Sequence, residues 1–260
     1  MADLFDLPEM SDPDPVRRAQ IQMLKPLPKR FYKDVGITET EDGFAIRLDG
    51  ASVRTPARNV LVVPSAALAD IVADEWRGQT EVIDPALMPV TRLVNSALDG
   101  VARDPDVTFN DILAFAGTDL LCYRAAEPER LVERQRAQWD PILAWAAETF
   151  GARFILAEGV MHQAQPQQAL AAFGQALGAF KAPLPLASLH VMTSLTGSAL
   201  LPLAFAMGRL SAEEAWALAH LDEDWQIELW GPDEEAAHRR AHRWQDMAAA
   251  ARAFDALDMR

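Results

Sequence analysis

The spacing of apolar residues changes along the chain, from every second position near the N-terminus to every third or fourth position later. Val35 and Ile37 alternate with polar neighbours, and Phe44, Ile46 and Leu48 do the same after a polar turn over residues 38–43. This period of two is typical of strands with one buried face. Further strands are expected around 53 and 60–63, so the sequence predicts a small antiparallel sheet.

Helical spacing begins at the Pro64-Ser65 pair and continues almost to the C-terminus. Apolar periodicity, with Gly and Pro as breaks, predicts helices over 65–76, 90–101, 104–115, 128–150, 166–180, 186–208, 211–230 and 232–257. Residues 154–160 fit a short extended segment, and 120–124 fit either a strand or a helix end.

The predicted fold class is α+β, with a small antiparallel β-rich N-terminal domain followed by a larger all-helical C-terminal domain. We place an N-terminal arm at 1–28, the β-rich domain at 29–102 and the helical domain at 103–260.

The predicted helix 211–230 has clear signals at both ends. Ser211 and Glu214 form a capping box, and Gly231-Pro232 ends the helix because Pro cannot continue it. One stripe at helical spacing is expected to pack inward. Its members are Leu218, Leu221, Trp225 and Leu229.

A neighbouring face of this helix combines a carboxylate with large apolar side chains. It carries Trp216, Glu223, Ile227 and Trp230, with Asp222 and Gln226 between it and the stripe. A glutamate in such surroundings is either ion-paired with an Arg of the next helix or offered to a partner. The sequence leaves both interpretations open.

Charge and composition exclude several classes of function. The net charge of -14 repels phosphate backbones, and the sequence contains no strong basic patch, so no nucleic-acid partner is expected. Cys122 is the single cysteine, which rules out an internal disulfide. The acidic N-terminus resembles neither a secretory signal nor a transit peptide.

Residues 182–208 contain no charged side chain and are long enough to span a bilayer. However, this stretch contains His190, several Ser and Thr residues and three prolines, without an aromatic belt or basic flanks. We therefore predict a buried central helix and no membrane insertion.

Motifs for catalysis or cofactor binding are missing from the sequence. It contains no Walker loop, no GxGxxG after a strand and no GxSxG elbow. Cys122 lacks the local signature of a nucleophile. We predict no catalytic residue, no cofactor and no metal ligand.

Two alternatives remain: a generic scaffold whose acidic surface binds a basic partner, and an enzyme of unknown class that uses acidic residues or a metal site. His238 and His242 lie one turn apart with Glu234 a turn earlier, so they could hold a metal. The HExxH pattern is missing, and neighbouring acids on one helix diverge by about 100° each, so they rarely flank one substrate bond.

An ordered series of short motifs gives the chain a family resemblance. The series comprises Arg30-Phe31-Tyr32-Lys33, Leu48-Asp49-Gly50 with Thr55-Pro56, Glu75-Trp76 with Gln79, Met88-Pro89-Val90-Thr91, Thr118 to Arg124, Trp139-Asp140-Pro141, and Asp222-Glu223 with Gln226, Trp230 and Gly231. From about residue 30 to 257 the chain resembles the ATP synthase assembly chaperones for the alpha subunit, the ATP-twelve family.

The resemblance implies a non-enzymatic chaperone that binds the free alpha subunit of the catalytic head, prevents its aggregation and hands it over to the beta subunit. It further implies Glu223 as the main client contact, supported by Asp222, Gln226 and Trp230. Trp76 also matches a family position, but its helical spacing indicates core or interdomain packing. We expect a monomer in the bacterial cytoplasm, or in the mitochondrial matrix for a trimmed eukaryotic member.

Overall fold

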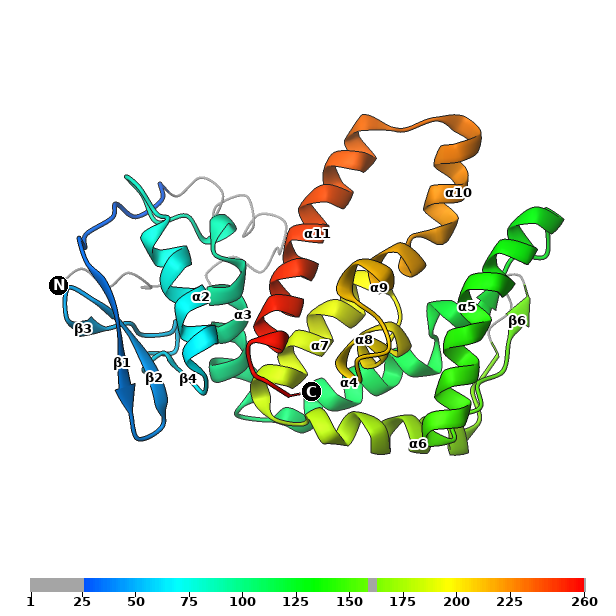
Figure 1. Ribbon diagram of the computed structural model, residues 1–260, viewed down its shortest axis with the longest axis horizontal. Helices are drawn as coiled ribbons and strands as arrows, with labels where there is room; N and C mark the ends of the chain where they lie inside the picture. Colours follow the sequence, from blue (N-terminus) through cyan, green and yellow to red (C-terminus); the bar gives the residue numbers. More distant parts are fainter. Residues whose placement is uncertain (1–25, 159–162, 260) are drawn as a thin grey trace, which may run out of the picture. The chain divides into compact units, whose positions relative to one another are not determined.

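The computed structural model describes residues 26–158 and 163–259. The predicted arm at 1–28 therefore lies almost entirely outside the described residues. The backbone divides into two compact units between Asn95 and Ser96. The predicted boundary between the β-rich domain and the helical domain, between residues 102 and 103, stays a prediction. Figure 1 labels the helices and strands along the chain.

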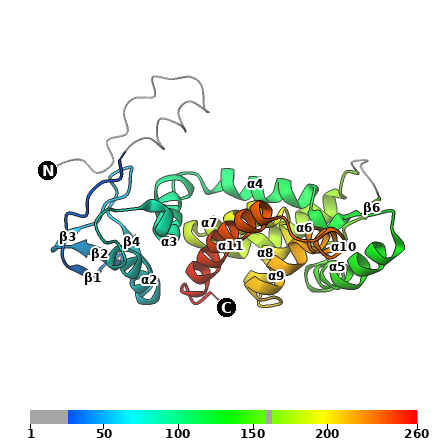
Figure 2. The same ribbon diagram turned by 90° about the horizontal axis from the view of Figure 1, so that it is seen from above.

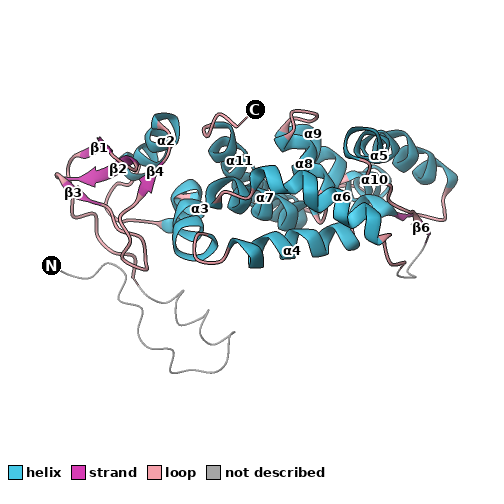
Figure 3. Cartoon of the chain, turned by 90° about the horizontal axis from the view of Figure 1, so that it is seen from below, coloured by secondary structure: helices cyan, strands magenta, loops and turns pink. Residues whose placement is uncertain are grey.

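The first unit is built on a four-stranded antiparallel sheet. Its strands are β1 (Val35–Thr40), β2 (Gly43–Leu48), β3 (Ala51–Ser52) and β4 (Val62–Val63). β2 is central, because β1, β3 and β4 all pair with it. The turn between β1 and β2 is Glu41-Asp42 alone. Residues 38–40, which were predicted to belong to the turn, continue β1. Figure 3 shows these strands in magenta.

Helices complete the first unit. They are α2 (Ala66–Arg77), the short η1 (Pro85–Leu87) and α3 (Pro89–Ser96), which continues into a π-helical turn η2 (Ala97–Val101). Ser65 caps α2, since its hydroxyl accepts a hydrogen bond from the Leu68 N–H. α2 packs on β1, β2 and β4 and buries Leu68 and Val72 against them.

Several motif residues of the first unit have structural roles. The Glu75 carboxylate accepts hydrogen bonds from the Val90 and Thr91 N–H groups at 2.8 and 2.7 Å, so it caps the N-terminus of α3. Trp76 is buried, as predicted, and the Tyr32 hydroxyl donates to its carbonyl oxygen at 2.6 Å. The Arg30 guanidinium donates to the carbonyl oxygen of Gln79.

The second unit is mostly helical. Its elements after η2 are α4 (Pro105–Gly117), η3 (Leu120–Cys122), β5 (Tyr123–Arg124), α5 (Glu129–Phe150), β6 (Ala157–Glu158), α6 (Gln167–Leu177), η4 (Gly178–Phe180), α7 (Pro183–Thr196), α8 (Leu200–Ala206), α9 (Ala212–Ala219), α10 (Leu221–Trp230) and α11 (Glu234–Asp255). The undecided segment 120–124 is a 3-10 turn followed by β5, which pairs in parallel with β6.

α7 lies at the centre of this unit and packs against α4, α8, α9 and α11. In Figure 2 it runs between α4 and α11. Most of its side chains are buried, including Leu186, Leu189 and Met192, which explains why residues 182–208 carry no charge. Within the described residues, no helix is long and apolar enough to cross a membrane.

The prediction of one helix over 186–208 is wrong. Gly197 takes a left-handed conformation with φ 67° and ends α7, and α8 starts afresh at Leu200. The N–H groups of Ala199 and Leu200 donate to the Asp119 carboxylate at 2.7 and 3.0 Å. A cap supplied by a distant segment leaves no local signal in the sequence.

The prediction of one helix over 211–230 is also wrong, although its capping box and its end at Gly231 are confirmed. The chain breaks at His220, whose N–H bonds to Ala217 instead of Trp216. Nδ1 of the His220 ring is hydrogen-bonded to the Trp216 carbonyl oxygen at 2.8 Å, and the Trp139 indole N–H donates to the Leu218 carbonyl oxygen at 2.9 Å. Two side chains thus replace backbone partners that a continuous helix would need.

The α+β class and the order of a small sheet followed by a helical part are confirmed.

Candidate functional site

α10, which carries all four predicted contact residues, is held against α5 by a side-chain hydrogen bond and an ion pair. Gln135 of α5 donates from Nε2 to Asp222 Oδ1 at 2.8 Å. Arg134, the residue before it, forms an ion pair with Glu228 at 2.7 Å. Figure 1 shows α10 and the first half of α11 extending beyond α7, α8 and α9.

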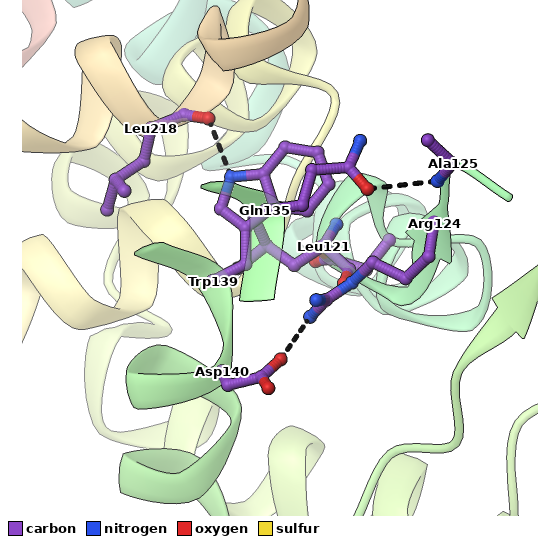
Figure 4. Close-up of polar contacts among 8 residues, drawn as sticks. Leu121, Arg124, Ala125, Gln135, Trp139, Asp140 and Leu218 are labelled. Carbon is purple, nitrogen blue, oxygen red and sulfur yellow. Dashed lines mark hydrogen bonds and ion pairs between the residues drawn. The ribbon is translucent and has the colours of Figure 1, made fainter. Parts of the chain in front are cut away.

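A buried polar cluster fixes α5 to the segments on either side of it (Figure 4). The Gln135 side-chain oxygen accepts a hydrogen bond from the Ala125 N–H at 2.9 Å, and the Trp139 indole donates to Leu218. Arg124 forms an ion pair with Asp140 at 2.8 Å, and its guanidinium lies 5.3 Å from the centre of the Trp139 ring. Gln135 therefore joins the end of β5 to the start of α10.

Three motifs of the resemblance meet in this cluster. The segment ending at Arg124, the Trp139-Asp140 pair and Asp222 are far apart in the sequence but connected here through Gln135 and Trp139. Buried Arg124 needs both its ion pair and the aromatic face, because an uncompensated buried charge is costly. These motif residues thus fix the direction in which α10 projects.

The four predicted contact residues do not share one environment. Asp222 accepts a hydrogen bond from Gln135 of α5, whereas Glu223 is partly exposed and Gln226 is exposed. At about 100° per residue, Glu223, Gln226 and Trp230 project to one side of the helix, away from the Arg134 contact of Glu228. Trp230 is 85% exposed.

The predicted inward stripe is only partly correct. Leu221 is buried, but Leu229 is 55% exposed at the end of α10. One residue before Leu229, the Glu228 carboxylate pairs with Arg134 of α5. Leu229 and Trp230 form an exposed apolar pair at the end of the helix, which we call the α10 tip.

The sequence allowed an ion pair between Glu223 and an Arg of the next helix. In the structure Asp224, the residue after Glu223, makes this ion pair instead. Arg240 of α11 pairs with Asp224. The Glu223 carboxylate lies 3.9 Å from His220 Nε2, with 39% of its side chain exposed. Glu223 thus combines access from solvent with buried neighbours, which suits a contact residue.

Sequence reasoning missed Arg134 and Gln135, which hold α10 from α5, and it considered an Arg of the next helix only for Glu223, not for Asp224. Arg134 and Gln135 are polar residues on a helix of ordinary composition, and both act on a segment distant in sequence. No local pattern distinguishes such a residue from a solvated one.

The remaining chemical candidates do not form a site in the described part of the chain. His238 and His242 are exposed on α11, and the described residues contain no group of three or more His, Cys, Asp or Glu placed to hold a metal. Cys122 is buried, and burial together with nearby Asp119 raises the pKa of its thiol to about 12. A protonated buried thiol is a poor nucleophile.

Comparison with known proteins identifies the family. Residues 29–147 match the family model described as ATP12 chaperone protein. The crystal structure of Atp12 from Paracoccus denitrificans is 39% identical, with a TM-score of 0.82, and the match covers 88% of this chain and 98% of that one. The chain belongs to the ATP12 family.

Two further relatives widen the comparison. The crystal structure of a putative chaperone from Agrobacterium tumefaciens is 59% identical with a TM-score of 0.87, covering 95% of this chain and 93% of that one. The mitochondrial protein atp12 of Schizosaccharomyces pombe is 24% identical over 231 residues, or 84% of this chain and 79% of that protein. ATP12 membership makes the chain a chaperone of ATP synthase assembly and not an enzyme.

Proposed function

We propose that this ATP12 chaperone binds the free alpha subunit of the ATP synthase catalytic head, prevents its aggregation and releases it to the beta subunit. Beyond the family, the observation that supports a client site on α10 is the α10 tip, where Trp230 is 85% exposed on a helix that Arg134 and Gln135 hold in place.

An exposed indole at the end of a fixed helix is suited to protein recognition. Trp is enriched among the residues that dominate binding energy, and a side chain on a preorganised helix loses little entropy on binding. An unassembled subunit exposes apolar interface that would otherwise self-associate. The α10 tip offers such an interface an apolar contact, and binding weaker than that of the final partner permits release.

Within this proposal the predicted residues have different roles. Glu223, Gln226 and Trp230 contact the client, because Glu223 is partly exposed and Gln226 and Trp230 are exposed. Asp222 positions the helix through its hydrogen bond with Gln135. Glu223 adds one acidic contact beside the apolar tip and so selects a client surface with a basic residue.

A second function, an acidic scaffold that binds any basic partner, is favoured only by the net charge of -14. Salt distinguishes the two. Binding by surface charge falls steeply as salt rises from about 0.1 M to about 1 M, whereas binding through an apolar anchor persists.

Glu223→Lys is expected to weaken capture of the alpha subunit at least about tenfold, because a lysine would meet the basic residue that Glu223 selects. Capture is measured by pull-down of purified alpha subunit, with circular dichroism to show that the variant is folded. Glu223→Gln, which keeps the shape of the side chain, should give a smaller loss.

The matched control is Glu148→Lys, an equal charge change at an exposed position in the last turn of α5. It should capture alpha as well as the unchanged chain. Equal loss in Glu148→Lys would mean that net charge, and not the Glu223 site, determines binding.

The comparisons also suggest where the protein acts. Identity to the two bacterial proteins is 59% and 39%, against 24% for the mitochondrial one. We therefore propose a bacterial cytoplasmic chaperone that is monomeric before it meets its client, which sizing of the free chain would test.

A further inference from the structure

His220 lies at the junction between α9 and α10 and is 6% exposed. Its ring lies 4.0 Å from the Trp216 ring, and Trp216 contacts Trp244 of α11 at 5.5 Å. The backbone carbonyl of His220 accepts the Asp224 N–H at 2.8 Å, which starts α10. This single residue therefore contacts the last turn of α9 and initiates the helix that carries Glu223.

The hydrogen bonds determine which ring nitrogen carries the proton. Nδ1 lies 2.8 Å from the Trp216 carbonyl oxygen, which can only accept, so Nδ1 is the protonated nitrogen. In the neutral ring Nε2 is then an unprotonated acceptor. It faces Glu223 Oε2 at 3.9 Å, and two acceptors at this distance form no hydrogen bond.

Charged groups reach His220 from two elements. Glu223 approaches from α10, and Arg240 and Arg243 approach from α11. Arg240 is paired with Asp224, and Arg243 donates to the Leu195 carbonyl oxygen. From α9 the ring meets Trp216, which does not titrate. Glu223 is thus the carboxylate that a protonated His220 would bind.

We propose that His220 is a positioning residue that controls whether Glu223 is available to the client. The neutral ring, fixed on the Trp216 carbonyl, leaves the Glu223 carboxylate accessible. Protonation adds a second N–H at Nε2, which draws the carboxylate into an ion pair and withdraws it from the client. This inference rests on the proposed function of Glu223.

The electrostatic surroundings keep His220 neutral under ordinary conditions. Burial lowers the pKa of the imidazole below 6.5, and Arg240 and Arg243 act in the same direction, against the Trp216 carbonyl and Glu223. The folded chain therefore binds this proton less readily than the unfolded chain. The contribution of the neutral ring to stability therefore decreases as the pH falls below 6.5, and client affinity decreases once the pH approaches the lowered pKa of the folded site.

The first test requires no client. Nuclear magnetic resonance of the histidine rings in the full chain should show the Nδ1–H tautomer for His220 and a pKa below the ordinary value. In Glu223→Gln the pKa of His220 should fall further, because the carboxylate that stabilises the imidazolium is gone. An unchanged pKa in that variant, or the Nε2–H tautomer, would overturn the inference whether or not a client binds.

The second test measures capture of the alpha subunit at about pH 7.5 and about pH 5.5, on either side of the ordinary histidine pKa. The unchanged chain should lose affinity at least about twofold on acidification, and His220→Asn should lose less than about 1.5-fold. Asn keeps an N–H donor near Nδ1 and removes Nε2.

His238→Asn, at an exposed position on α11, is the matched control and should keep the full acid dependence. The inference is wrong if His220→Asn retains that dependence as well. No capture by the unchanged chain at either pH would instead contradict the proposed function, and the resonance test would then decide the role of His220 by itself.

Discussion

Replacing Asp119 by Ala is expected to lower the melting temperature of the helical unit by roughly 10 °C. The Asp119 carboxylate is fully buried and accepts hydrogen bonds from the N–H groups of Leu121, Ala199 and Leu200 and from the Ser198 hydroxyl. Alanine would leave three backbone donors without their acceptor. Each such buried group costs about 1–3 kcal/mol, and about 4 kcal/mol in total corresponds to this shift for a unit of this size.

Burial raises the pKa of Asp119 to about 6, so the group is still a carboxylate at neutral pH. Thermal unfolding followed by circular dichroism at neutral pH measures the change. Asp106→Ala is the control, because Asp106 makes an exposed ion pair with Lys181 that is worth less than about 1 kcal/mol. Equal melting temperatures for the two variants would show that Asp119 does not cap α8 in solution.

Trp230→Ala is expected to weaken capture of the alpha subunit about 30-fold while leaving stability within about 0.5 kcal/mol. The indole is 85% exposed, so folding gains little from it, whereas an indole buried on binding contributes about 2 kcal/mol or more. Titration of the chaperone against immobilised alpha subunit gives the affinity, and thermal unfolding gives the stability.

Val107→Ala is the matched control for Trp230, since Val107 of α4 is an apolar residue that is 65% exposed away from α10. This variant should bind like the unchanged chain. If Trp230→Ala bound equally well, the client site would have to be sought away from the α10 tip.

The sequence predicted the ends of several helices correctly where a capping residue or a glycine marks the end itself. Ser65, Ser211 with Glu214, and Gly231 all act at the ends where the pattern placed them. Gly197 was a local signal for the end of α7 that the long apolar run hid, whereas the start of α8 depends on Asp119 and the break at His220 on Trp139, which bond to backbone groups far away in the sequence. Apolar periodicity detects burial but not such contacts across the fold.

The same limit applies to the candidate site. Trp230 and Leu229 both fit helical spacing, yet Leu229 is 55% exposed near the end of α10, a helix that extends beyond α7, α8 and α9 (Figure 1). The motifs around Glu75, Trp139 and Asp222 were visible in the sequence, but only the structure shows that their side chains cap a helix and orient α10.

Co-expression of the chain with the alpha subunit of the same organism, followed by pull-down and sizing, tests the central claim most directly. The account predicts a soluble stoichiometric complex with alpha and none when beta replaces it. If the alpha subunit aggregates as it does alone, or if the chain captures beta equally well, the proposed client is wrong. The assignment to the ATP12 family and the fold would not be affected.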